Sequence, residues 1–457
     1  MNNKKLQDKL FLKKESAWKN LKQEEVFKFC EDYKNFLRQS KTERQCVKNI
    51  IKILEENGFT KFNYELREGT KCYKVVKDKC VIACIVGENK TSFRLLGSHV
   101  DSPRLDLKPT PLYEDSNLAL LQTHYYGGIK KYHWVNTPLI LQGVVMLKDG
   151  KKVEISIGDK DYDPVFVIPD LLPHLAKEQM KKEGNKIVEG EELNVLFASI
   201  PINDEEIKEQ IKFSVLKQVN EDYGMIEEDF VTAELEFVPA YVPRDVGLGK
   251  GMIGAYGQDD RVCVYTTLKA ISEINDPKHT CIGLFVDKEE IGSMGDTGAQ
   301  SLILRNFIYE YRMALGLTTD VSKIMEDSKA LSADVTAGLN PNYKNVHDDK
   351  NVSYLGKGVS VEKYGGGGGK YSTHDAHAEF VQEIRTILDD NKIPWQTGEL
   401  GKIDIGGGGT IAMFLSRYGM DCIDAGPCVL GMHSPFEITN KADVYCAYLL
   451  YKKFLIR

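Results

Sequence analysis

The stretch GSHVDSPR, residues 97–104, decides how the rest of the chain is interpreted. It follows the apolar run FRLL at residues 93–96, which is typical of the end of a buried strand. His99 and Asp101 are two residues apart, so at a strand end their side chains point to the same side. This arrangement can aim an imidazole at a metal ion while a carboxylate orients it from behind. Taken alone, the pair is more often buried and hydrogen-bonded without any ligand.

Length and composition limit the classes of protein that this chain can belong to. Its 457 residues favour two domains, or one domain with a large insertion. No run approaches the roughly 18 apolar residues of a membrane span, and the N-terminal MNNKK has no apolar signal region behind it. The net charge of −7 disfavours a nucleic-acid surface. We expect a soluble, cytoplasmic protein that binds neither nucleic acid nor membrane.

The cysteines also favour a cytoplasmic location. The chain contains ten, none of them in a Cys-x-x-Cys pair, and most lie in apolar segments. This pattern is typical of reduced thiols in the cytosol, and it disfavours both a disulfide framework and a zinc site made of thiolates.

The pattern of predicted secondary structure changes twice along the chain. Residues 1–57 have helical periodicity, and short apolar runs at 71–96 predict strands that lead to His99. From residue 105 to 246 short β-rich runs recur between turn signals, around a charged helix-and-loop segment at 171–192. We expect strands in this region at residues 118–121, 139–145, 153–157, 165–167 and 234–238. We interpret residues 105–246 as a smaller β-rich domain inserted into a discontinuous domain of residues 1–104 and 247–457.

After the second change, helices and strands alternate. The predicted elements are a helix at 260–274, a strand at 280–286, a strand at 359–361, a helix at 375–389 and a strand at 422–423. This alternation is typical of an α/β domain in which helices flank a mostly parallel or mixed sheet. Ligands of such sheets bind at the carboxyl ends of the strands.

Acidic and imidazole side chains recur at or after the predicted strands. Besides His99 and Asp101 they are Asp259 with Asp260, Glu289 with Glu290, Asp334 and His433. Carboxylates and imidazoles without thiolates suit one or two divalent ions that leave a water free for chemistry. Each position also has a simpler interpretation: a helix N-cap, a solvated helix start, a turn residue or a hydrogen-bonded loop histidine. Two adjacent glutamates offer two roles, because one can bind metal while the other acts as a general base.

Two glycine runs stand out. The run at 365–369 does not match a phosphate-binding loop, because Lys370 is followed by Tyr371 and not by Ser or Thr. Its glycines indicate positive φ angles or a close approach of backbones. The run at 406–409 is expected to open a helix, where its amides face an anion or simply form a tight turn.

Five motifs together resemble the M18 metalloaminopeptidases, the family that includes aspartyl aminopeptidase. They are GSHVDSPR, GQDDR, DKEEIGS, SADVTAGLNPNY and GMHSPFE, beginning at residues 97, 257, 287, 332 and 431. The resemblance covers nearly the whole chain, in the order of the family. It implies a zinc-peptidase fold, with a mixed sheet between helices and an inserted β-rich oligomerisation domain. It also implies a tetrahedral homododecamer that removes the N-terminal residue from peptides with a free N-terminus.

The resemblance implies a co-catalytic pair of divalent ions, usually zinc, although a His and carboxylate site also accepts cobalt or manganese. By motif, the ligands are His99 and Asp334 for one ion, Glu290 and His433 for the other, and Asp259 as the bridge. Asp259 is preferred to Asp260 because the family pattern places the bridging ligand first in that pair.

Four further residues receive roles from the same resemblance. Glu289 is the general base that takes a proton from water and delivers it to the leaving amine, and Asp101 orients His99. His174 resembles a residue that the family lends to a neighbouring subunit's active site, with an ordinary helix-start histidine as the alternative. Lys363 resembles a substrate-facing lysine.

Two other functions remain open at this stage. One is a metal-dependent deacylase or carboxypeptidase on the same scaffold. The other is a non-catalytic binding or cargo homologue, which would be expected to have lost Glu289 or a ligand; none is lost here.

Overall fold

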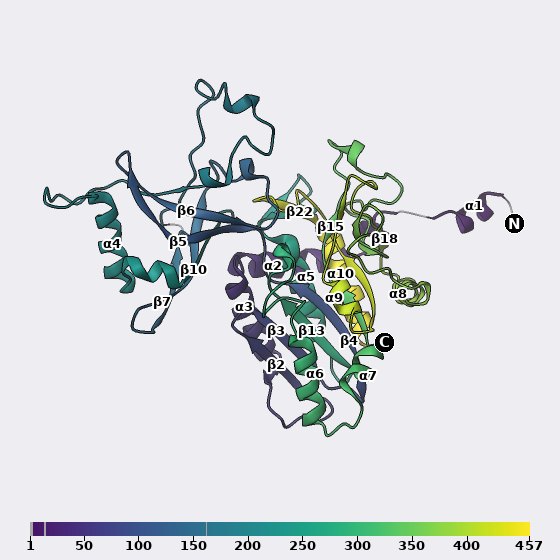
Figure 1. Cartoon of the computed structure of the whole chain (residues 1–457). Coiled ribbons are helices and arrows are strands. Elements are labelled where there is room, and N and C mark those ends of the chain that lie inside the picture. The colour runs from purple at the N-terminus through teal and green to yellow at the C-terminus, as the bar shows by residue number, and fades with distance from the viewer. Residues whose placement is uncertain (1–2, 13–14, 161) are drawn as a thin grey trace.

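The structure is a computed structural model that describes residues 3–12, 15–160 and 162–457. The predicted helical region 1–57 includes residues 1, 2, 13 and 14, which lie outside the described part. Figure 1 shows a body of helices around one sheet beside a second sheet that carries α4 (Gln210–Tyr223). The short helix α1 (Asn3–Leu10) stands apart from both.

A nine-stranded sheet forms the centre of the larger body. Its four middle strands run parallel, in the order β13 (His279–Val286), β4 (Asn89–His99), β14 (Lys329–Ser332) and β20 (Asp421–Gly426). Antiparallel neighbours flank them, so the predicted mixed α/β sheet is confirmed. The outer strands are β1 (Thr60–Lys61), β2 (Lys71–Val76) and β3 (Cys80–Ile85) on one side, and β16 (Val359–Glu362) and β18 (Trp395–Thr397) on the other.

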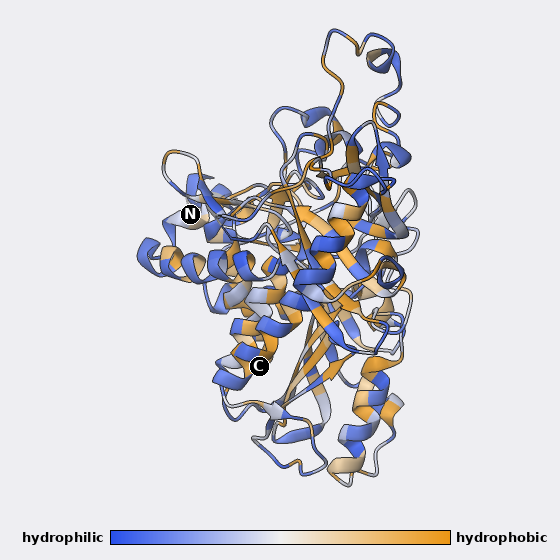
Figure 2. Cartoon of the chain, turned by 90° about the vertical axis from the view of Figure 1, so that its left-hand side faces the viewer, coloured by the Kyte–Doolittle hydropathy of each residue, from blue (hydrophilic) through white to orange (hydrophobic). Residues whose placement is uncertain are grey.

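Helices cover both faces of this sheet. Along β3, Val81 and Ala83 contribute to one hydrophobic core while Ile82 and Cys84 contribute to another, as the two-residue period of a strand requires. Figure 2 shows the apolar strands between helices whose outer faces are polar. The first core contains α2 (Gln23–Gln39), α3 (Glu43–Glu56), α5 (Gln258–Ser272), α8 (Ala378–Asp390) and α10 (Lys441–Leu455); the second contains α6 (Ile303–Ala314), α7 (Val321–Glu326) and α9 (Ala412–Ser416).

A six-stranded antiparallel sheet occupies the segment between residues 104 and 239 and has its own hydrophobic core. One sequence expectation for this segment was wrong, and one element was missed. Residues 165–167 make only isolated bridges, and the helix α4 was not foreseen although Ile211, Val215 and Val219 recur at helical spacing on its buried face. In sheet order the strands are β8 (Lys152–Ile157), β7 (Leu139–Met146), β10 (Ala233–Pro239), β5 (Arg104–Asp115), β6 (Leu118–Tyr126) and β9 (Val195–Ala198).

A five-stranded sheet connects the two bodies. Its order is β11 (Arg244–Val246), β12 (Met252–Ala255), β22 (Glu437–Asn440), β21 (Cys428–Leu430) and β15 (Thr336–Ala337). Short 3₁₀ turns complete the fold: η1 (Ala17–Lys19), η2 (Lys131–His133), η3 (Gln179–Lys181), η4 (Gly190–Glu192), η5 (Glu227–Thr232), η6 (Glu289–Ile291) and η7 (Lys344–Val346).

The two glycine runs pair with each other. β17 (Gly366–Gly367) lies antiparallel to β19 (Gly407–Gly408), and the helix expected directly after the second run is present as α9, which begins at Ala412. A Cβ on Gly407 would lie 2.3 Å from the carbonyl oxygen of Gly366, and the φ of Gly407 is 140°. The close approach of the two backbones is therefore the physical reason for glycine here.

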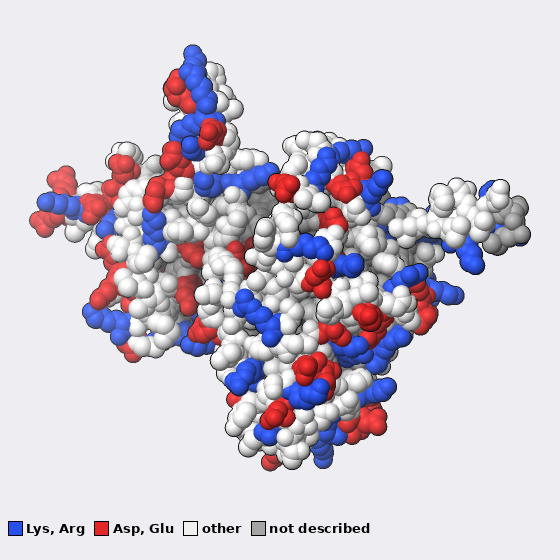
Figure 3. All heavy atoms as spheres, turned by 45° about the vertical axis from the view of Figure 1, so that its right-hand side comes forward, with Lys and Arg blue, Asp and Glu red and all other residues white. Residues whose placement is uncertain are grey.

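The surface carries both signs of charge. On the face shown in Figure 3, acidic and basic side chains are interspersed over both bodies. Within the described ranges, no helix has the length and apolar character needed to cross a membrane.

Candidate metal centre

The predicted site residues meet at one edge of the nine-stranded sheet. His99 ends β4, Glu289 and Glu290 follow β13, and Asp334 follows β14. These strands are adjacent and parallel, so their carboxyl ends lie together. The remaining two residues arrive from the five-stranded sheet. They are Asp259, which follows β12, and His433, which lies between β21 and β22.

Five side chains form two donor groups that share one member. Nε2 of His99 lies 3.2 Å from Oδ1 of Asp259 and 3.9 Å from Oδ1 of Asp334. Nε2 of His433 lies 3.3 Å from Oδ2 of Asp259 and 3.2 Å from Oε2 of Glu290. In each group of three the donor atoms lie within 4.8 Å of one another. Asp259 presents one oxygen to each imidazole and therefore belongs to both groups.

Asp259 and Asp260 have different surroundings. Asp260 is fully buried, and its Oδ2 accepts the backbone N–H of His99 at 3.3 Å instead of facing the imidazoles. Both residues have non-helical φ and ψ at the start of α5, so the regular part of the helix begins only after Asp260. This departure turns the Asp259 carboxylate into the cluster.

Each imidazole is oriented through its other ring nitrogen. Nδ1 of His99 lies 3.1 Å from the carbonyl oxygen of Asp101 and 3.3 Å from its carboxylate. Nδ1 of His433 lies 2.7 Å from the carbonyl oxygen of Gly128, in the loop after β6 of the six-stranded sheet. An acceptor at Nδ1 favours a proton there, so Nε2 of each neutral ring would be the nitrogen available to a metal ion.

The carboxylate of Asp101 also holds the loop that follows β13. Its Oδ1 accepts the backbone N–H of Glu289 and its Oδ2 that of Glu290, both at 3.1 Å. The hydroxyl of Tyr126, from β6, donates to Oδ2 at 2.9 Å. Asp101 is fully buried, so these donors replace the water that a charged carboxylate would otherwise bind.

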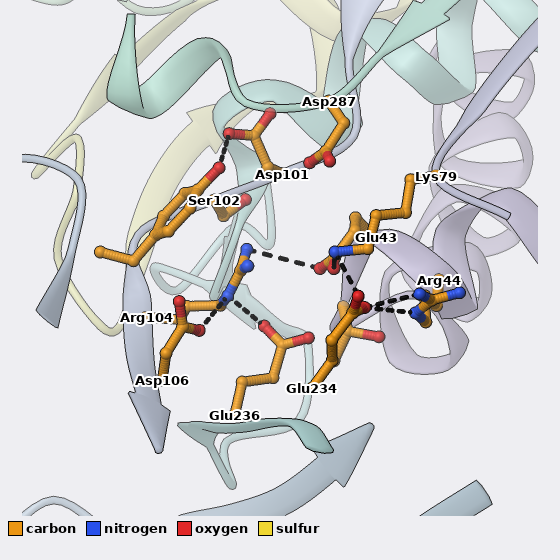
Figure 4. Close-up of polar contacts among 12 residues, drawn as sticks. Glu43, Arg44, Lys79, Asp101, Ser102, Arg104, Asp106, Glu234, Glu236 and Asp287 are labelled. Atoms are coloured by element: carbon orange, nitrogen blue, oxygen red, sulfur yellow. Dashed lines mark hydrogen bonds and ion pairs between the residues drawn. The ribbon is translucent and has the colours of Figure 1, made fainter. Parts of the chain in front are cut away.

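Beside Asp101, a buried ion-pair network joins the two bodies (Figure 4). Nε of Arg104 lies 2.7 Å from Asp106 and 2.5 Å from Glu236 of β10, while its Nη1 lies 3.4 Å from Glu43 of α3. The guanidinium also lies 3.9 Å from the ring centre of Tyr126. Arg104 therefore links the six-stranded sheet to α3 and to the tyrosine that donates to Asp101.

The charges of the cluster are unbalanced. Burial raises the pKa of Glu289 to about 7, and burial together with neighbouring carboxylates raises the pKa values of Glu290 and Asp334 well above their ordinary range. Burial alone would lower the pKa of His433, but Asp259 and Glu290 raise it to about 10. The carboxylates thus outnumber the imidazoles that could neutralise them.

This donor set fits divalent cations. Nitrogen and oxygen donors surround two positions, as zinc sites require. Oε1 of Glu290 is buried and has no hydrogen-bond partner among the described residues. Bound cations would neutralise the crowded carboxylates and give that oxygen a partner.

Two predicted residues lie apart from the cluster. His174 is exposed in the long segment between β8 and β9, which forms the teal excursion at the top of Figure 1. Lys363 is exposed directly after β16. Neither makes a hydrogen bond or ion pair with the cluster among the described contacts.

Three groups that support the site were not identified from the sequence: the phenol of Tyr126, the carbonyl of Gly128 and the carboxylate of Glu437. The first two come from the six-stranded sheet and carry no local signal. Glu437 ends the motif GMHSPFE, so its place four residues after His433 was a signal that could have been used.

Comparisons with known proteins identify the family of the chain. The family model described as aminopeptidase I zinc metalloprotease (M18) matches residues 36–455. A probable M18 family aminopeptidase 1 from Clostridium acetobutylicum is 47% identical over 441 residues, which cover 94% of this chain and 95% of the relative. A crystal structure of an M18 aminopeptidase from Thermotoga maritima has a TM-score of 0.94 and 46% identity over 97% of this chain and 99% of that one.

A more distant structure shares only the fold. The mApe1 dodecamer of S. cerevisiae has a TM-score of 0.73 at 21% identity and covers 93% of this chain and 95% of that one. The match to the family model and the high identities, however, span nearly the whole sequence. The chain therefore belongs to the M18 family of zinc aminopeptidases.

Proposed function

We propose that this aminopeptidase removes the N-terminal residue from peptides at a centre of two divalent ions, most naturally zinc. The observation that carries the proposal is that Asp259 faces both imidazoles, each of which has its own further carboxylate, Asp334 or Glu290. A shared carboxylate between two such groups is what a pair of neighbouring ions requires. The His and carboxylate donors would also accept cobalt or manganese.

The roles of the residues follow from their positions. His99 and Asp334 would hold one ion, Glu290 and His433 would hold the other, and Asp259 would be shared between them. When bound, zinc supplies positive charge that acidifies water and polarises a carbonyl. The acidic character of the cluster also favours the positively charged amino end of a peptide over its carboxylate end.

Glu289 is the general base. Its Oε2 lies 3.9 Å from Nε2 of His99, at the cluster but outside both donor groups, so the carboxylate is free to accept a proton from water. The protonated carboxyl then delivers the proton to the leaving amine. Asp101 positions the base because it accepts the backbone N–H of Glu289.

We propose that residues 105–246 form an inserted domain that mediates assembly into a tetrahedral homododecamer. The six-stranded sheet has its own core, and its long segment exposes Leu171, Leu172 and Leu175. The yeast relative is described as a dodecamer. In such an assembly His174, from the same exposed segment, acts in the active site of a neighbouring subunit, and Lys363 contacts the substrate. The ten cysteines are all free and buried, which favours a cytoplasmic location.

A substitution of the base tests the proposal. The Glu289→Gln chain should keep its fold and zinc content but lose about 10² to 10⁴ in kcat on aminoacyl-nitroanilides. Glu228→Gln, at an exposed ion pair of the six-stranded sheet, is the matched control and should keep full activity. Activity is measured after the metal has been removed with a chelator and again after zinc, cobalt or manganese has been added back.

Three results would contradict the proposal. A metal-replete wild-type chain that cleaves no free-amine substrate would favour the non-catalytic alternative. Cleavage of N-acylated peptides, or release of C-terminal residues, would favour the deacylase or carboxypeptidase. An undiminished kcat in Glu289→Gln would remove the assignment of the base.

A further inference from the structure

Glu437, the first residue of β22, holds two ligand-bearing segments by their backbones. Its Oε1 accepts the N–H of His433 at 2.8 Å, and its Oε2 accepts the N–H of Asp259 at 3.0 Å. The side chain is buried, with 1% of its surface exposed. One carboxylate therefore connects two residues that are far apart in the sequence and adjacent in the cluster.

Both of these backbones leave regular secondary structure. His433 has a φ of 64°, in the left-handed region, which is unfavourable for a residue with a Cβ. Asp259 is non-helical, with a φ of −80° and a ψ of 107°. An N–H in such a segment has no helix or sheet partner, and a buried N–H without a partner is unfavourable. Glu437 supplies the acceptor for both.

Further contacts fix Glu437 and the segment that it holds. β22 pairs with β12, and Ala255 lies opposite Glu437 in the register. Gln258, next to Asp259, donates from Nε2 to the carbonyl oxygen of Glu437 at 2.6 Å. The carboxylate therefore has little freedom to move, so the distance between the two backbones that it holds is fixed as well.

We propose that Glu437 is a positioning residue for the metal centre: it sets the spacing of Asp259 and His433 before any ion arrives. The inference rests on the proposed function in so far as these residues are ligands. Asp101 performs the equivalent task for Glu289 and Glu290 on the opposite side. Two carboxylates that bind no metal thus arrange the backbones of four cluster residues. Outer contacts of this kind commonly contribute 10- to 100-fold to metal affinity.

Asp443 provides a matched control. It is also a fully buried carboxylate that accepts two backbone N–H groups, those of Gly356 and Gly358, each at 2.7 Å. The loop that it holds carries no cluster residue. A general loss of stability from removing a buried carboxylate would appear in Asp443→Asn and Glu437→Gln alike, whereas a loss of metal affinity should appear only in Glu437→Gln.

The experiment measures zinc retention and needs no turnover. Zinc-loaded wild type, Glu437→Gln, Glu437→Asp and Asp443→Asn are dialysed against graded chelator, and zinc per chain is measured by atomic absorption. We expect Glu437→Gln to release zinc at a free-zinc level at least tenfold higher than wild type, Glu437→Asp to be intermediate, and Asp443→Asn to match wild type. In the metal-free proteins, the amide protons of Asp259 and His433 should exchange faster in Glu437→Gln.

Equal zinc retention in wild type and Glu437→Gln would overturn the proposal. Equal losses in Glu437→Gln and Asp443→Asn would also overturn it, because the effect would then be general. Should Glu437→Gln not fold, the comparison of Glu437→Asp with Asp443→Asn gives the same decision. A wild-type chain that holds zinc but cleaves no free-amine substrate would refute the proposed function and leave this inference standing.

Discussion

The hydroxyl of Tyr126 donates a hydrogen bond of 2.9 Å to Oδ2 of Asp101. Tyr126 belongs to the six-stranded sheet, whereas Asp101 follows the central strand of the nine-stranded sheet and holds the Glu289 loop. The placement of one sheet is therefore coupled to the groups proposed for catalysis on the other. The carbonyl of Gly128, which orients His433, makes a second coupling of the same kind.

Replacement of Tyr126 by Phe should lower kcat about tenfold and leave KM nearly unchanged, because a hydrogen bond to a charged group contributes about 1.5–3 kcal/mol. The ring and its stacking with Arg104 remain in this variant. Steady-state kinetics on a nitroanilide substrate measure the effect. Tyr125→Phe, at an adjacent side chain that is 40% exposed, serves as the control. Equal kcat values for both variants would mean that the hydroxyl does not position Asp101.

Replacement of Arg104 by Met should lower the free energy of unfolding by about 3–5 kcal/mol, because Glu236 would remain buried without its counter-ion and Glu43 would keep only Lys79. Urea unfolding at one fixed metal content measures the loss. Lys148→Met removes only an exposed pair with Glu228 and should change nothing measurable. Adding Glu236→Gln to Arg104→Met should restore part of the stability; no recovery would show that the network is not the cause.

The two donor groups predict different zinc contents for two variants. Asp334→Asn alters a group that is proposed to hold one ion, so the chain should retain about one zinc instead of two. Asp259→Asn alters the shared residue, so the chain should retain less than Asp334→Asn at the same chelator concentration. The zinc content of each variant, measured after identical dialysis, distinguishes these outcomes. Retention of two zinc ions by Asp259→Asn would exclude the bridge.

The buried Asp443 predicts a pH dependence of stability away from the metal centre. Burial raises its pKa to about 7, from an ordinary value near 3.8. Between about pH 4 and 7 the folded chain keeps a proton that the unfolded chain has released, so the free energy of unfolding falls as the pH rises, and this contribution is lost above pH 7. The slope is at most about 1.4 kcal/mol per pH unit.

Asn at position 443 does not titrate, so the Asp443→Asn chain should lack this part of the slope. Urea unfolding of both proteins at pH 5, 6, 7 and 8 gives the difference in their free energies of unfolding. That difference should change steadily up to pH 7 and then stay constant. Parallel curves over the whole range would contradict the raised pKa.

Local patterns were sufficient to predict the α/β sheet and the regions of its main elements. The strand expected at 280–286 is β13 (His279–Val286), and the helix expected at 375–389 is α8 (Ala378–Asp390). The strand is a nearly continuous buried apolar run and the helix carries apolar residues at the helical period, so the sequence contains the information. The helix expected at 260–274 agrees with α5 (Gln258–Ser272) to within two residues at each end, and the departure of Asp259 and Asp260 from helical geometry was not foreseen.

Tertiary contacts explain what the sequence did not reveal. The pairing of β17 with β19 joins two glycine runs that are distant in the chain, and no local pattern selects a partner. Glu437 likewise accepts the backbone N–H groups of Asp259 and His433 only because the fold brings these two residues together. The candidate ligands were identified by motif, and their roles stay predictions until metal analysis tests them.

The donors of the cluster are spread from His99 to His433, about three quarters of the length of the chain. During synthesis, His99 therefore leaves the ribosome long before His433 is added to the chain. Nascent or prematurely ended chains that lack β22 (Glu437–Asn440) would have neither the Glu437 carboxylate nor its anchoring strand. Cellular zinc would then be captured stably only by chains that have been completed, and its uptake would mark the end of folding.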